Sequence, residues 1–399
     1  MKVITDEKKI DELLSRGVEE VIEKEHLRKA LLSGKQLRVK LGIDPTSSDL
    51  HLGHGVVLRK LKAFQDLGHK AVLVIGDFTA SIGDPTGRVK ARPALSAVEI
   101  KKNMKGYLKQ AGKVIDVKRA EIKYNNKWLS KMKLSKMIEF SSLLGIGEVL
   151  QREDFRKRME GIEAPRVNEI LYSIMQGIDS VQLKVDVELG GNDQLLNNMM
   201  GRTLMGKLGM ESQDVLTTQL LEGTDGTEKM SKSLGNYIGL NDSADEMYGK
   251  LMSIKDELIE KYLWLCTDLD KDSISGILEA DGNPKNQKAW LAFEVVALYH
   301  GREAAGKAQT EFGKVFSEGE TPSEVAVIKI EKNHVTLLDL VMQVDGIKSK
   351  SEARRIIGQG GVKVNGHQLM DGNRPIALES EVLVQVGKRR FAKFIKERV

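Results

Sequence analysis

The chain has 399 residues, of which 41% are hydrophobic, 30% are charged and one is cysteine. This length predicts two or three domains with real apolar cores, and a single cysteine excludes a disulfide scaffold. No apolar run approaches the roughly 20 residues of a membrane-spanning helix, and the formal net charge is only +5, so we expect a protein of the reducing cytoplasm with no membrane partner.

The first quarter of the chain alternates between predicted helices and strands. Apolar residues recur at helical spacing over 6–32, which predicts one helix ending near Gly34. The segments "QLRVKLGI" at 36–43 and "KAVLVIG" at 70–76 predict buried strands, with a helix between them that Gly68 caps. This order is typical of a parallel, doubly wound α/β sheet.

A basic stretch over about 88–165 interrupts this pattern. Residues 88–160 hold 19 Lys or Arg against 8 Asp or Glu, and the stretch contains helical segments, so we interpret it as an insertion. The sheet pattern resumes with a predicted helix over 167–184 and a strand that runs into the glycine turn "LGGNDQ". Segregated positive charge favours a polyanionic partner, although a solvated lysine-rich face is the commoner explanation of any one run.

The rest of the chain predicts two more domains. Residues from about 245 to 315 are almost wholly helical in pattern, and a loop at 317–324 follows. Residues 333–399 form a compact α+β unit, in which 334–399 hold 12 Lys or Arg against 7 Asp or Glu. A solvated basic tail would not explain the apolar pattern of this unit, which can form a small core from Leu337, Leu340, Val341, Ile356, Val362 and Val364.

Two of the seven histidines, His51 and His54, lie in "DLHLGHGV" between a predicted strand and a predicted helix. A protein metal site usually needs three or four ligands, and no HExxH spacing completes one here. Unpaired amides and the helix dipole make such a turn an anion site. Taken alone, the pair is equally consistent with phosphate binding and with two structural histidines that cap a turn.

A second motif, "EKMSKSLGN" at 228–236, concentrates Lys229 and Lys232 among small polar residues. Two ammonium groups suit the charge that develops on a leaving polyphosphate, and a solvated turn is the alternative explanation of this stretch by itself. Together and in this order, "HLGH" and "KMSKS" resemble the signature pair of the class I aminoacyl-tRNA synthetases.

Further blocks resemble one branch of that class, the tyrosyl-tRNA synthetases: "GIDPTSSDLHLGH", "IGDPTGR", "LYSIMQGIDS" and "LGGNDQ". The resemblance covers nearly the whole chain. It implies a Rossmann-like catalytic domain over 1–245, whose insertion at about 88–165 forms a dimer interface. It also implies a helical anticodon-side domain over 246–325 and a ribosomal-protein-type RNA-binding domain over 333–399.

The resemblance implies a tyrosine–tRNA ligase reaction in two steps. L-tyrosine attacks the α-phosphate of ATP to give tyrosyl-AMP and pyrophosphate, and the tyrosyl group then passes to the 3′ end of tRNA(Tyr). A carboxylate is already ionised near neutral pH, so the first step needs positioning and charge stabilisation and no catalytic base. We expect Mg²⁺ to arrive with ATP, with no metal held by protein ligands alone, and we expect a homodimer.

By the same resemblance each site residue has an implied role. The catalytic residues are His51, His54, Lys229 and Lys232, and the ATP site adds Gly53, Gly191, Asp193, Ser233 and Arg88 to Lys232. The tyrosine pocket takes Asp84, Tyr172 and Gln176 for the α-ammonium group and Asp179 for the phenol, with Thr79 and Gln194 as further candidates. Residues 172, 176 and 179 fall at i, i+4 and i+7, so they share one helix face.

One position departs from the commonest pattern of the family. Where many members read Tyr-Cys-Gly before "DPT", this chain reads Lys40, Leu41 and Gly42, so a phenol-contacting tyrosine is missing. A bacterial subfamily with this lysine variant exists, and Glu188 before "LGGNDQ" resembles it as well. We hypothesise that Lys40 contacts the phenol.

Two surfaces complete the prediction. The resemblance of the C-terminal unit assigns tRNA binding to Arg354, Arg355, Lys388, Arg389 and Arg390. The insertion offers Met137, Ile138, Phe140, Leu143 and Leu144 to a partner subunit.

The alternative functions are those of a tryptophanyl-tRNA synthetase or another nucleotidyl transferase with the same histidine pair, and of a noncatalytic RNA-binding protein with a synthetase fold.

Overall fold

The structure is a computed structural model of the chain. It describes residues 2–86, 95–150, 153–161, 164–279, 282–317, 325–330, 334–344, 346–347, 349–378, 381–387 and 390–396. The chain forms two compact units, residues 1–302 and 303–399. Within the described ranges, no helix has the length and apolar character needed to cross a bilayer.

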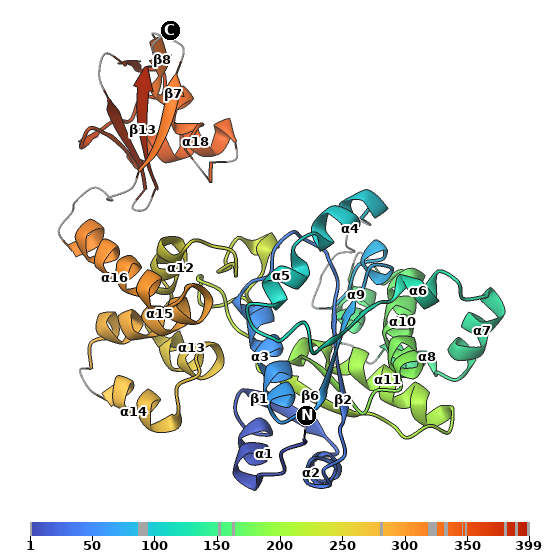
Figure 1. Cartoon of the computed structure of the whole chain (residues 1–399). Coiled ribbons are helices and arrows are strands. Elements are labelled where there is room, and N and C mark those ends of the chain that lie inside the picture. Colours follow the sequence, from blue (N-terminus) through green and yellow to red (C-terminus); the bar gives the residue numbers. More distant parts are fainter. Residues whose placement is uncertain are drawn as a thin grey trace. The chain divides into compact units, whose positions relative to one another are not determined.

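A six-stranded sheet forms the centre of the first unit (Figure 1). Its strands in spatial order are β1 (Val18–Ile22), β6 (Asp214–Thr218), β5 (Val187–Gly191), β2 (Arg38–Ile43), β3 (Lys70–Ile75) and β4 (Glu121–Tyr124). All neighbouring strands are parallel except β1, which runs antiparallel to β6. The strand order reverses between β2 and β5, and the carboxyl ends of strands at such a point are where open α/β sheets bind ligands.

Helices cover both faces of this sheet, with α3 (Leu52–Asp66) on one side and α10 (Val167–Leu183) and α11 (Leu195–Lys207) on the other (Figure 1). The predicted strands over 36–43 and 70–76 are confirmed as β2 and β3, and Gly68 ends α3 with φ +91°. The doubly wound α/β fold predicted from the sequence is therefore confirmed.

The prediction of one helix over 6–32 is wrong. This segment forms α1 (Glu7–Leu13), β1 and α2 (Lys24–Leu32), with Gly17 at φ +63° in the turn before β1. The apolar residues Val18, Val21 and Ile22 are β-branched and pair with β6, and β-branched side chains favour a strand. Pairing with a distant strand overrides the local helical periodicity.

The basic stretch also contributes to the sheet, which the sequence did not indicate. It contains α4 (Ala97–Met104), α5 (Tyr107–Ala111), α6 (Asn126–Leu129), α7 (Leu134–Ser142), α8 (Ile146–Leu150) and α9 (Glu153–Met159), and between α5 and α6 it forms β4. Because β4 pairs in parallel with β3, with Tyr124 opposite Ile75, the stretch supplies an edge strand and the residues that follow it.

The five apolar residues expected to face a partner subunit have different environments. Phe140 is only 5% exposed, in a cluster with Leu129, Ile174, Ile178 and Leu204, and Met137, Leu143 and Leu144 are partly buried against this cluster. Phe140 is therefore part of the chain's own core. Of the five, Ile138 is the one that is largely exposed, at 59%, with Leu134 one turn earlier at 75%.

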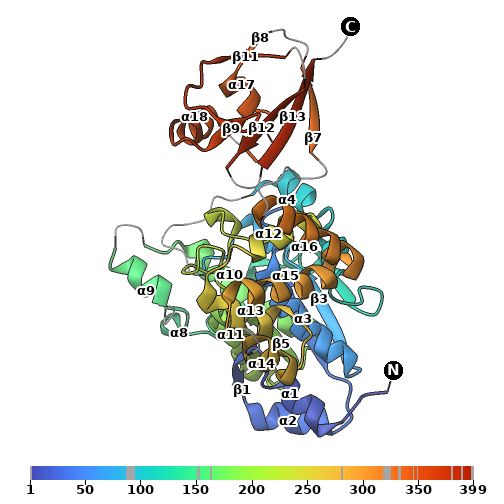
Figure 2. The ribbon, with the colours of Figure 1, turned by 90° about the vertical axis from the view of Figure 1, so that its left-hand side faces the viewer.

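Helices α12 (Ala244–Leu251), α13 (Ile259–Cys266), α14 (Lys271–Glu279) and α15 (Pro284–His300) form a group in which α12, α13 and α14 all contact α15 (Figure 2). This confirms the predicted helical character of the segment, and α13 also contacts α3 of the sheet domain. The single cysteine, Cys266, is buried at the end of α13.

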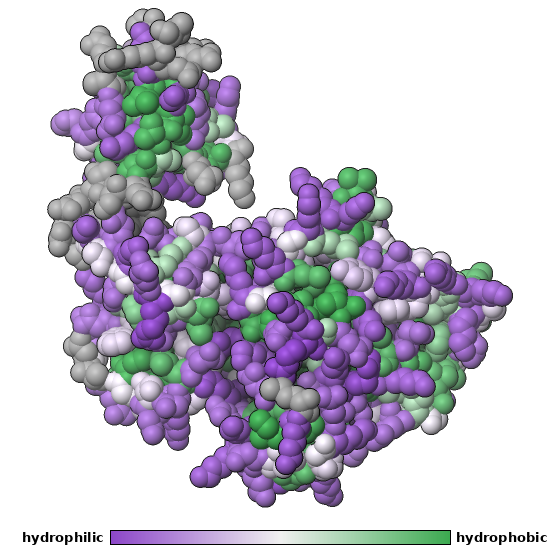
Figure 3. All heavy atoms as spheres, in the orientation of Figure 1, coloured by the Kyte–Doolittle hydropathy of each residue, from purple (hydrophilic) through white to green (hydrophobic). Residues whose placement is uncertain are grey.

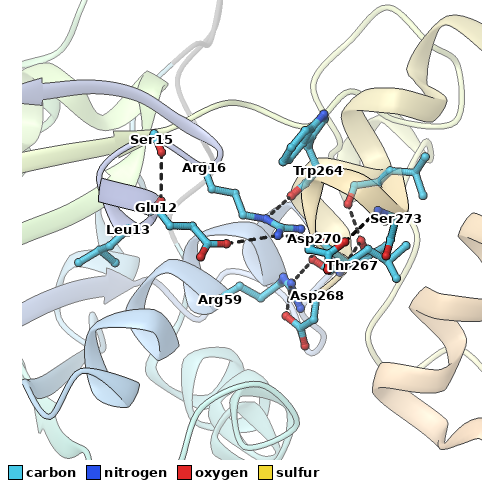
Figure 4. Close-up of polar contacts among 12 residues, drawn as sticks. Glu12, Leu13, Ser15, Arg16, Arg59, Trp264, Thr267, Asp268, Asp270 and Ser273 are labelled. Atoms are coloured by element: carbon cyan, nitrogen blue, oxygen red, sulfur yellow. Dashed lines mark hydrogen bonds and ion pairs between the residues drawn. The ribbon is translucent and has the colours of Figure 1, made fainter. Parts of the chain in front are cut away.

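Two arginines join the sheet domain to the turn after α13 (Figure 4). Arg16 donates to the carbonyl oxygens of Trp264 at 3.2 Å, Thr267 at 2.8 Å and Leu269 at 2.7 Å. Arg59, on α3, donates to the Thr267 carbonyl and to the Asp268 carboxylate at 2.5 Å. The carbonyl groups at the end of α13 and just after it are therefore bound by cations, which is favourable at a helix C-terminus.

The second unit begins in α16 (Arg302–Ser317) and contains a five-stranded sheet. The strand order is β10 (His367–Gln368), β9 (Val362–Val364), β12 (Val382–Val386), β13 (Arg390–Lys396) and β7 (Ala326–Ile330). The strands β8 (His334–Thr336) and β11 (Pro375–Ala377) form a separate pair, beside α17 (Leu337–Val341) and α18 (Lys350–Gly358).

The predicted core of this unit is confirmed. Leu337, Leu340, Val341 and Val362 are fully buried, Val364 is nearly so, and Ile356 packs against them. Because β7 pairs in parallel with β13, this sheet already includes residues before 333, where the predicted domain began.

Candidate active site

A cavity of about 720 Å³ opens at the carboxyl ends of the central strands. Its wall includes the "HLGH" turn after β2, the residues after β5 and the "KMSKS" segment. It also includes the face of α10 that carries Tyr172, Gln176 and Asp179. The structure therefore brings most of the sequence-predicted site residues into one cavity.

The two histidines stand at the first turn of α3. His51 is the N-cap residue, and its backbone N–H donates to His54 Nδ1 at 3.3 Å, while the two ring centroids are 3.9 Å apart. His51 Nδ1 is buried and has no hydrogen-bond partner among the described residues. A polar atom left in this state at a helix N-terminus is well placed to meet an anionic ligand.

Both imidazoles are neutral at physiological pH. Burial, together with His54 and Lys232, lowers the pKa of His51 to about 2, and burial and Lys232 lower the pKa of His54 to about 4. Each ring therefore carries one N–H donor and no charge. The positive charge of this end of the cavity comes from lysine.

The two lysines of "KMSKS" are ion-paired to carboxylates across the cavity. Lys229 Nζ lies 2.7 Å from Asp193 Oδ2, and Lys232 Nζ lies 2.8 Å from Asp49 Oδ2. Asp49 belongs to the "DLHLGH" turn, so the second pair joins the two signature motifs directly. Backbone bonds join the same turn to the residues that follow "KMSKS", with Leu52 N–H donating to Ile238 O at 2.9 Å and Leu240 N–H donating to Leu50 O at 2.8 Å.

The other predicted ATP residues lie around these pairs. Gly53, Gly191 and Ser233 line the cavity, and a Cβ on Gly191 would stand 2.9 Å from Asp193 Oδ1, so a side chain there would crowd that carboxylate. Ser233 Oγ is 2.9 Å from Ser231 Oγ. Arg88 lies outside the described residues.

The middle of the cavity holds two partly buried carboxylates. Asp44 accepts from Thr79 Oγ1 at 2.8 Å and from Tyr172 OH at 3.0 Å. Asp84 accepts from Gln194 Nε2 at 2.7 Å. Burial raises the pKa of Asp44 to about 7, with the charges of Asp84 and Asp179 adding to the rise against the two hydrogen bonds. This region is ready to take a cation such as an α-ammonium group.

Sequence reasoning missed Asp44, although a signal for it existed. The residue directly follows β2, at the carboxyl end of a central parallel strand, where ligand-binding side chains gather. Its place also requires glycine at position 76, because a Cβ on Gly76 would overlap the Asp44 carboxylate.

Asp179 closes the far end of the cavity. Its carboxylate accepts from Asn125 Nδ2 at 3.1 Å and from Trp128 Nε1 at 2.8 Å. Burial raises the pKa of Asp179 to about 6, and the charge of Lys40 and these hydrogen bonds oppose the rise. Asn125 and Trp128 were also missed, because they follow β4 and that strand was not recognised.

Lys40 lies in the cavity wall, but its ammonium group is already bonded. It is 2.9 Å from Glu188 Oε1 and donates to Ser180 Oγ at 2.7 Å and to the Gln176 carbonyl at 3.1 Å. An ammonium group has three N–H donors, and three acceptors surround this one. The hypothesis that Lys40 contacts the phenol directly therefore finds no free donor here.

In the part of the chain that the structure describes, no group of three or more His, Cys, Asp or Glu side chains is placed to hold a metal ion.

The predicted tRNA-binding residues belong to the second unit. Arg354 and Arg355 are exposed on α18, and Arg390 is exposed at the start of β13. Lys388 and Arg389 lie outside the described residues.

Comparisons with known proteins agree with one another. A family model described as tRNA synthetases class I (W and Y) matches residues 32–317. Tyrosine–tRNA ligase 2 of Clostridium acetobutylicum is 44% identical over 401 residues, covering 98% of this chain and 100% of the relative. The tyrosine–tRNA ligase of Thermotoga maritima is 47% identical over 386 residues, covering 95% of each chain.

The fold has solved counterparts as well. A C-terminally truncated mitochondrial tyrosyl-tRNA synthetase of Aspergillus nidulans is similar with a TM-score of 0.64 and 24% identity. The match covers 77% of this chain and 94% of that one. At this identity the likeness concerns the fold.

Proposed function

The chain belongs to the tyrosyl-tRNA synthetases, a family of class I aminoacyl-tRNA synthetases, and on this premise we propose how its residues divide the reaction between them. It is a tyrosine–tRNA ligase, which joins tyrosine to tRNA at the expense of ATP. The tryptophan-specific and noncatalytic alternatives are not favoured, because relatives of 44% and 47% identity that match nearly end to end are tyrosine–tRNA ligases.

One observation carries the assignment of the residues. The Lys232–Asp49 ion pair joins the two signature motifs at a cavity whose wall also holds the polar face of α10. RNA binding alone would need neither motif. A cavity with cations at one end and carboxylates at the other suits two substrates of opposite character, a nucleoside triphosphate and an amino acid.

We assign tyrosine to the carboxylate end. Its α-ammonium group would bind Asp44 and Asp84, with Tyr172, Gln176, Gln194 and Thr79 completing the subsite. Its phenol O–H would donate to Asp179. A buried Asp179 without that donor would lose a hydrogen bond, which disfavours phenylalanine in this pocket.

The first step needs no general base. The tyrosine carboxylate is ionised and attacks the α-phosphorus of ATP. A bond forms between the carboxylate oxygen and phosphorus, and the bond from phosphorus to the bridging oxygen breaks as pyrophosphate leaves. The protein contributes positioning of the two substrates and donors for the phosphate charge.

We assign the stabilisation of the phosphate charge to the other end of the cavity. His51 and His54 would donate neutral N–H groups to the phosphates, while Lys229 and Lys232 would leave their carboxylates and bind the departing pyrophosphate. Asp193, once free of Lys229, would accept ribose hydroxyls beside Gly191. Gly53, Ser233 and Arg88 complete the proposed ATP site.

We propose MgATP as the form of the nucleotide that binds. The phosphate end offers lysines, neutral imidazoles and carboxylates that are already ion-paired. This donor set suits phosphate oxygens, and it suggests that Mg²⁺ would be ligated mainly by those oxygens, whose charge it would offset.

For the second substrate, tRNA(Tyr), the exposed cations of the second unit support a binding role. Arg354, Arg355 and Arg390, with Lys388 and Arg389, would contact phosphates, which carry most of the affinity in such complexes. Since tRNA charging serves protein synthesis and the single cysteine is buried, we place the enzyme in the cytoplasm.

We also propose a homodimer. Hydrophobic residues gather on the edge of the molecule that carries α7 and α8 (Figure 3). Leu134, Ile138 and Ile146 are each more than half exposed there, and exposed apolar patches of this kind mark interaction sites. Sedimentation velocity of the chain tests this point, since a purely monomeric protein would contradict it.

ATP–pyrophosphate exchange tests the function as a whole. We expect exchange with L-tyrosine and none with tryptophan or phenylalanine at the same concentration, followed by charging of purified tRNA(Tyr). Exchange driven by tryptophan would overturn the substrate assignment, and a protein inert in exchange would overturn the enzymatic one.

A further inference from the structure

A buried ion pair lies beneath the tyrosine pocket. Lys40 and Glu188 are opposite each other in the parallel pairing of β2 with β5. Lys40 Nζ and Glu188 Oε1 are 2.9 Å apart, and each side chain is only 1% exposed. The pair therefore lies at the topological switch of the sheet, under α10.

Both members of the pair bind the same turn of α10. Lys40 donates to the Gln176 carbonyl at 3.1 Å and to Ser180 Oγ at 2.7 Å. Glu188 accepts from Gln176 Nε2 at 3.1 Å and from Ser180 Oγ at 2.9 Å. The position of this turn relative to the sheet is thus fixed by four hydrogen bonds.

Asp179 lies on this turn, between Gln176 and Ser180. It is 4% exposed, and its carboxylate must be ionised to accept a phenol O–H while it also accepts from Asn125 and Trp128. The charged and titratable groups that face it are Lys40 on β2, Glu188 on β5, Asp44 after β2, and Tyr172 on its own helix.

Among these groups Lys40 is the one cation. Burial raises the pKa of Asp179, the Lys40 charge is the strongest influence that lowers it, and the Glu188 charge acts in the opposite direction with less effect. Without Lys40, Asp179 would face only negative or neutral groups in a buried site, and a buried carboxyl group in that setting takes up a proton.

The stability of the fold does not account for the pair. Taking two charges out of water costs about as much as their attraction returns, and well-packed uncharged residues of similar size are often as stable. Charges in this position therefore point to a role in the pocket above them.

We propose that Lys40, held by Glu188, is a positioning residue for tyrosine recognition: it anchors the α10 turn that carries Asp179 and supplies the positive charge that keeps the Asp179 carboxylate ionised. This inference rests on the proposed function, in which Asp179 accepts the phenol hydroxyl. Lys40 thereby acts on the phenol through Asp179 and not by direct contact.

Two competitive inhibitors separate this effect from the rest of the pocket. Tyrosinol and phenylalaninol share the ammonium group and differ in the phenol hydroxyl. The ratio of their inhibition constants in tyrosine-dependent exchange therefore depends on the protonation of Asp179, whereas the protonation of Asp44 affects both constants alike. In the wild type we expect the preference for tyrosinol to fall as the pH drops through about 6.

The pH at which half of this preference is lost is the midpoint, and two variants should move it in opposite directions. Lys40→Met with Glu188→Gln removes the cation together with its partner, so no unpaired buried charge remains, and the midpoint should rise by about one pH unit or more. Gln213 Oε1, which is unpaired among the described residues, could accept from the new amide. Glu188→Gln alone leaves Lys40 facing Asp179, and the midpoint should fall.

The opposite signs make the test decisive. Unchanged midpoints in both folded variants would overturn the proposal, and so would shifts in the same direction, because a merely structural role predicts a general loss. If the wild type does not prefer tyrosinol at any pH, the assignment of Asp179 to the phenol fails, which is a different result.

Discussion

Lys232 Nζ lies 2.8 Å from Asp49 Oδ2, so a cation of the "KMSKS" segment is held by a carboxylate two residues before His51. The pair can form because the residues after "KMSKS" run beside the "HLGH" turn and hydrogen-bond to it. In our proposal the lysine must leave this carboxylate to reach pyrophosphate.

Removing each partner should therefore have different effects. Lys232→Met should slow tyrosyl-adenylate formation by about 10²–10³-fold, since a preorganised donor to the transition state is lost. Asp49→Asn removes a competitor for the lysine. Because Asp49 is partly exposed, its pair is worth at most about 1 kcal/mol, and ATP binding should tighten by no more than about fivefold. Stopped-flow measurement of adenylate formation over a range of ATP concentrations checks both, and weaker ATP binding by Asp49→Asn would contradict this account.

Replacing both histidines should affect the chemical step and spare tyrosine binding. His51→Ala with His54→Ala removes two neutral donors, each worth about 10²-fold or more if it binds the transition state. Among the described residues, no hydrogen bond or ion pair joins either histidine to Asp44 or Asp179. Equilibrium dialysis with labelled tyrosine should give a dissociation constant within about threefold of the wild type, whereas exchange collapses. A large loss of tyrosine affinity would place the histidines elsewhere in the site.

The affinity for the amino acid should depend on pH near neutrality. Burial raises the pKa of Asp44 to about 7, so below this pH the free protein holds a proton that an incoming ammonium group must displace. Affinity should therefore decline as the pH falls through 7, by up to tenfold per unit. Calorimetry with phenylalaninol in two buffers of different ionisation enthalpy should detect proton release near pH 6.5. Asp44→Asn, which cannot titrate, should release none.

The cations of the second unit should serve tRNA and not tyrosine activation. Changing Arg354 and Arg355, or Lys388, Arg389 and Arg390, to alanine should weaken tRNA binding and make it less dependent on salt, because fewer phosphates are neutralised. Exchange without tRNA should keep its wild-type rate. Equal losses in charging and in exchange would mean that the unit supports the fold of the enzyme instead.

Arg16 should matter to stability far from the cavity. Arg16→Ala removes three hydrogen bonds from a charged donor to the end of α13 and the turn after it, and we expect the free energy of unfolding to fall by about 2–3 kcal/mol. Amide hydrogen exchange should quicken in α13 first. The matched control is Arg28→Ala, which removes surface ion pairs with Glu7 and Asp11. It should leave amide hydrogen exchange in α13 unchanged.

The sequence predicts the cavity residues well where they belong to contiguous motifs. "HLGH", "KMSKS" and the polar face over 172–179 each have a local pattern, and the structure brings these segments to one cavity. The sequence is less informative where a contact depends on the pairing of strands that are distant along the chain. The strand β1 has helical periodicity in its apolar residues, and only β6, nearly 200 residues later, decides its conformation.

Because β4 was not predicted, more of the site went unrecognised than through the error at β1. Its four residues, "EIKY", lie between helical segments and carry a weak signal. Recognising them would have placed Asn125 and Trp128 at the carboxyl end of the sheet and so beside Asp179. Lys40 was difficult for another reason, since a sequence shows that a lysine has replaced a tyrosine but not that Glu188 lies opposite to it.

The paired state of Lys229 and Lys232 also bears on what the cavity excludes. Bare ammonium groups would attract any phosphate that passes, including the backbone of the tRNA that the enzyme must handle. Here each lysine is neutralised by its own carboxylate, so a polyanion gains little by entering. In our proposal, a nucleotide can replace the lysine as the partner of Asp193, because its ribose hydroxyls would donate to that carboxylate. On this proposal, the two ion pairs would disfavour anions that offer Asp193 and Asp49 no donor in exchange.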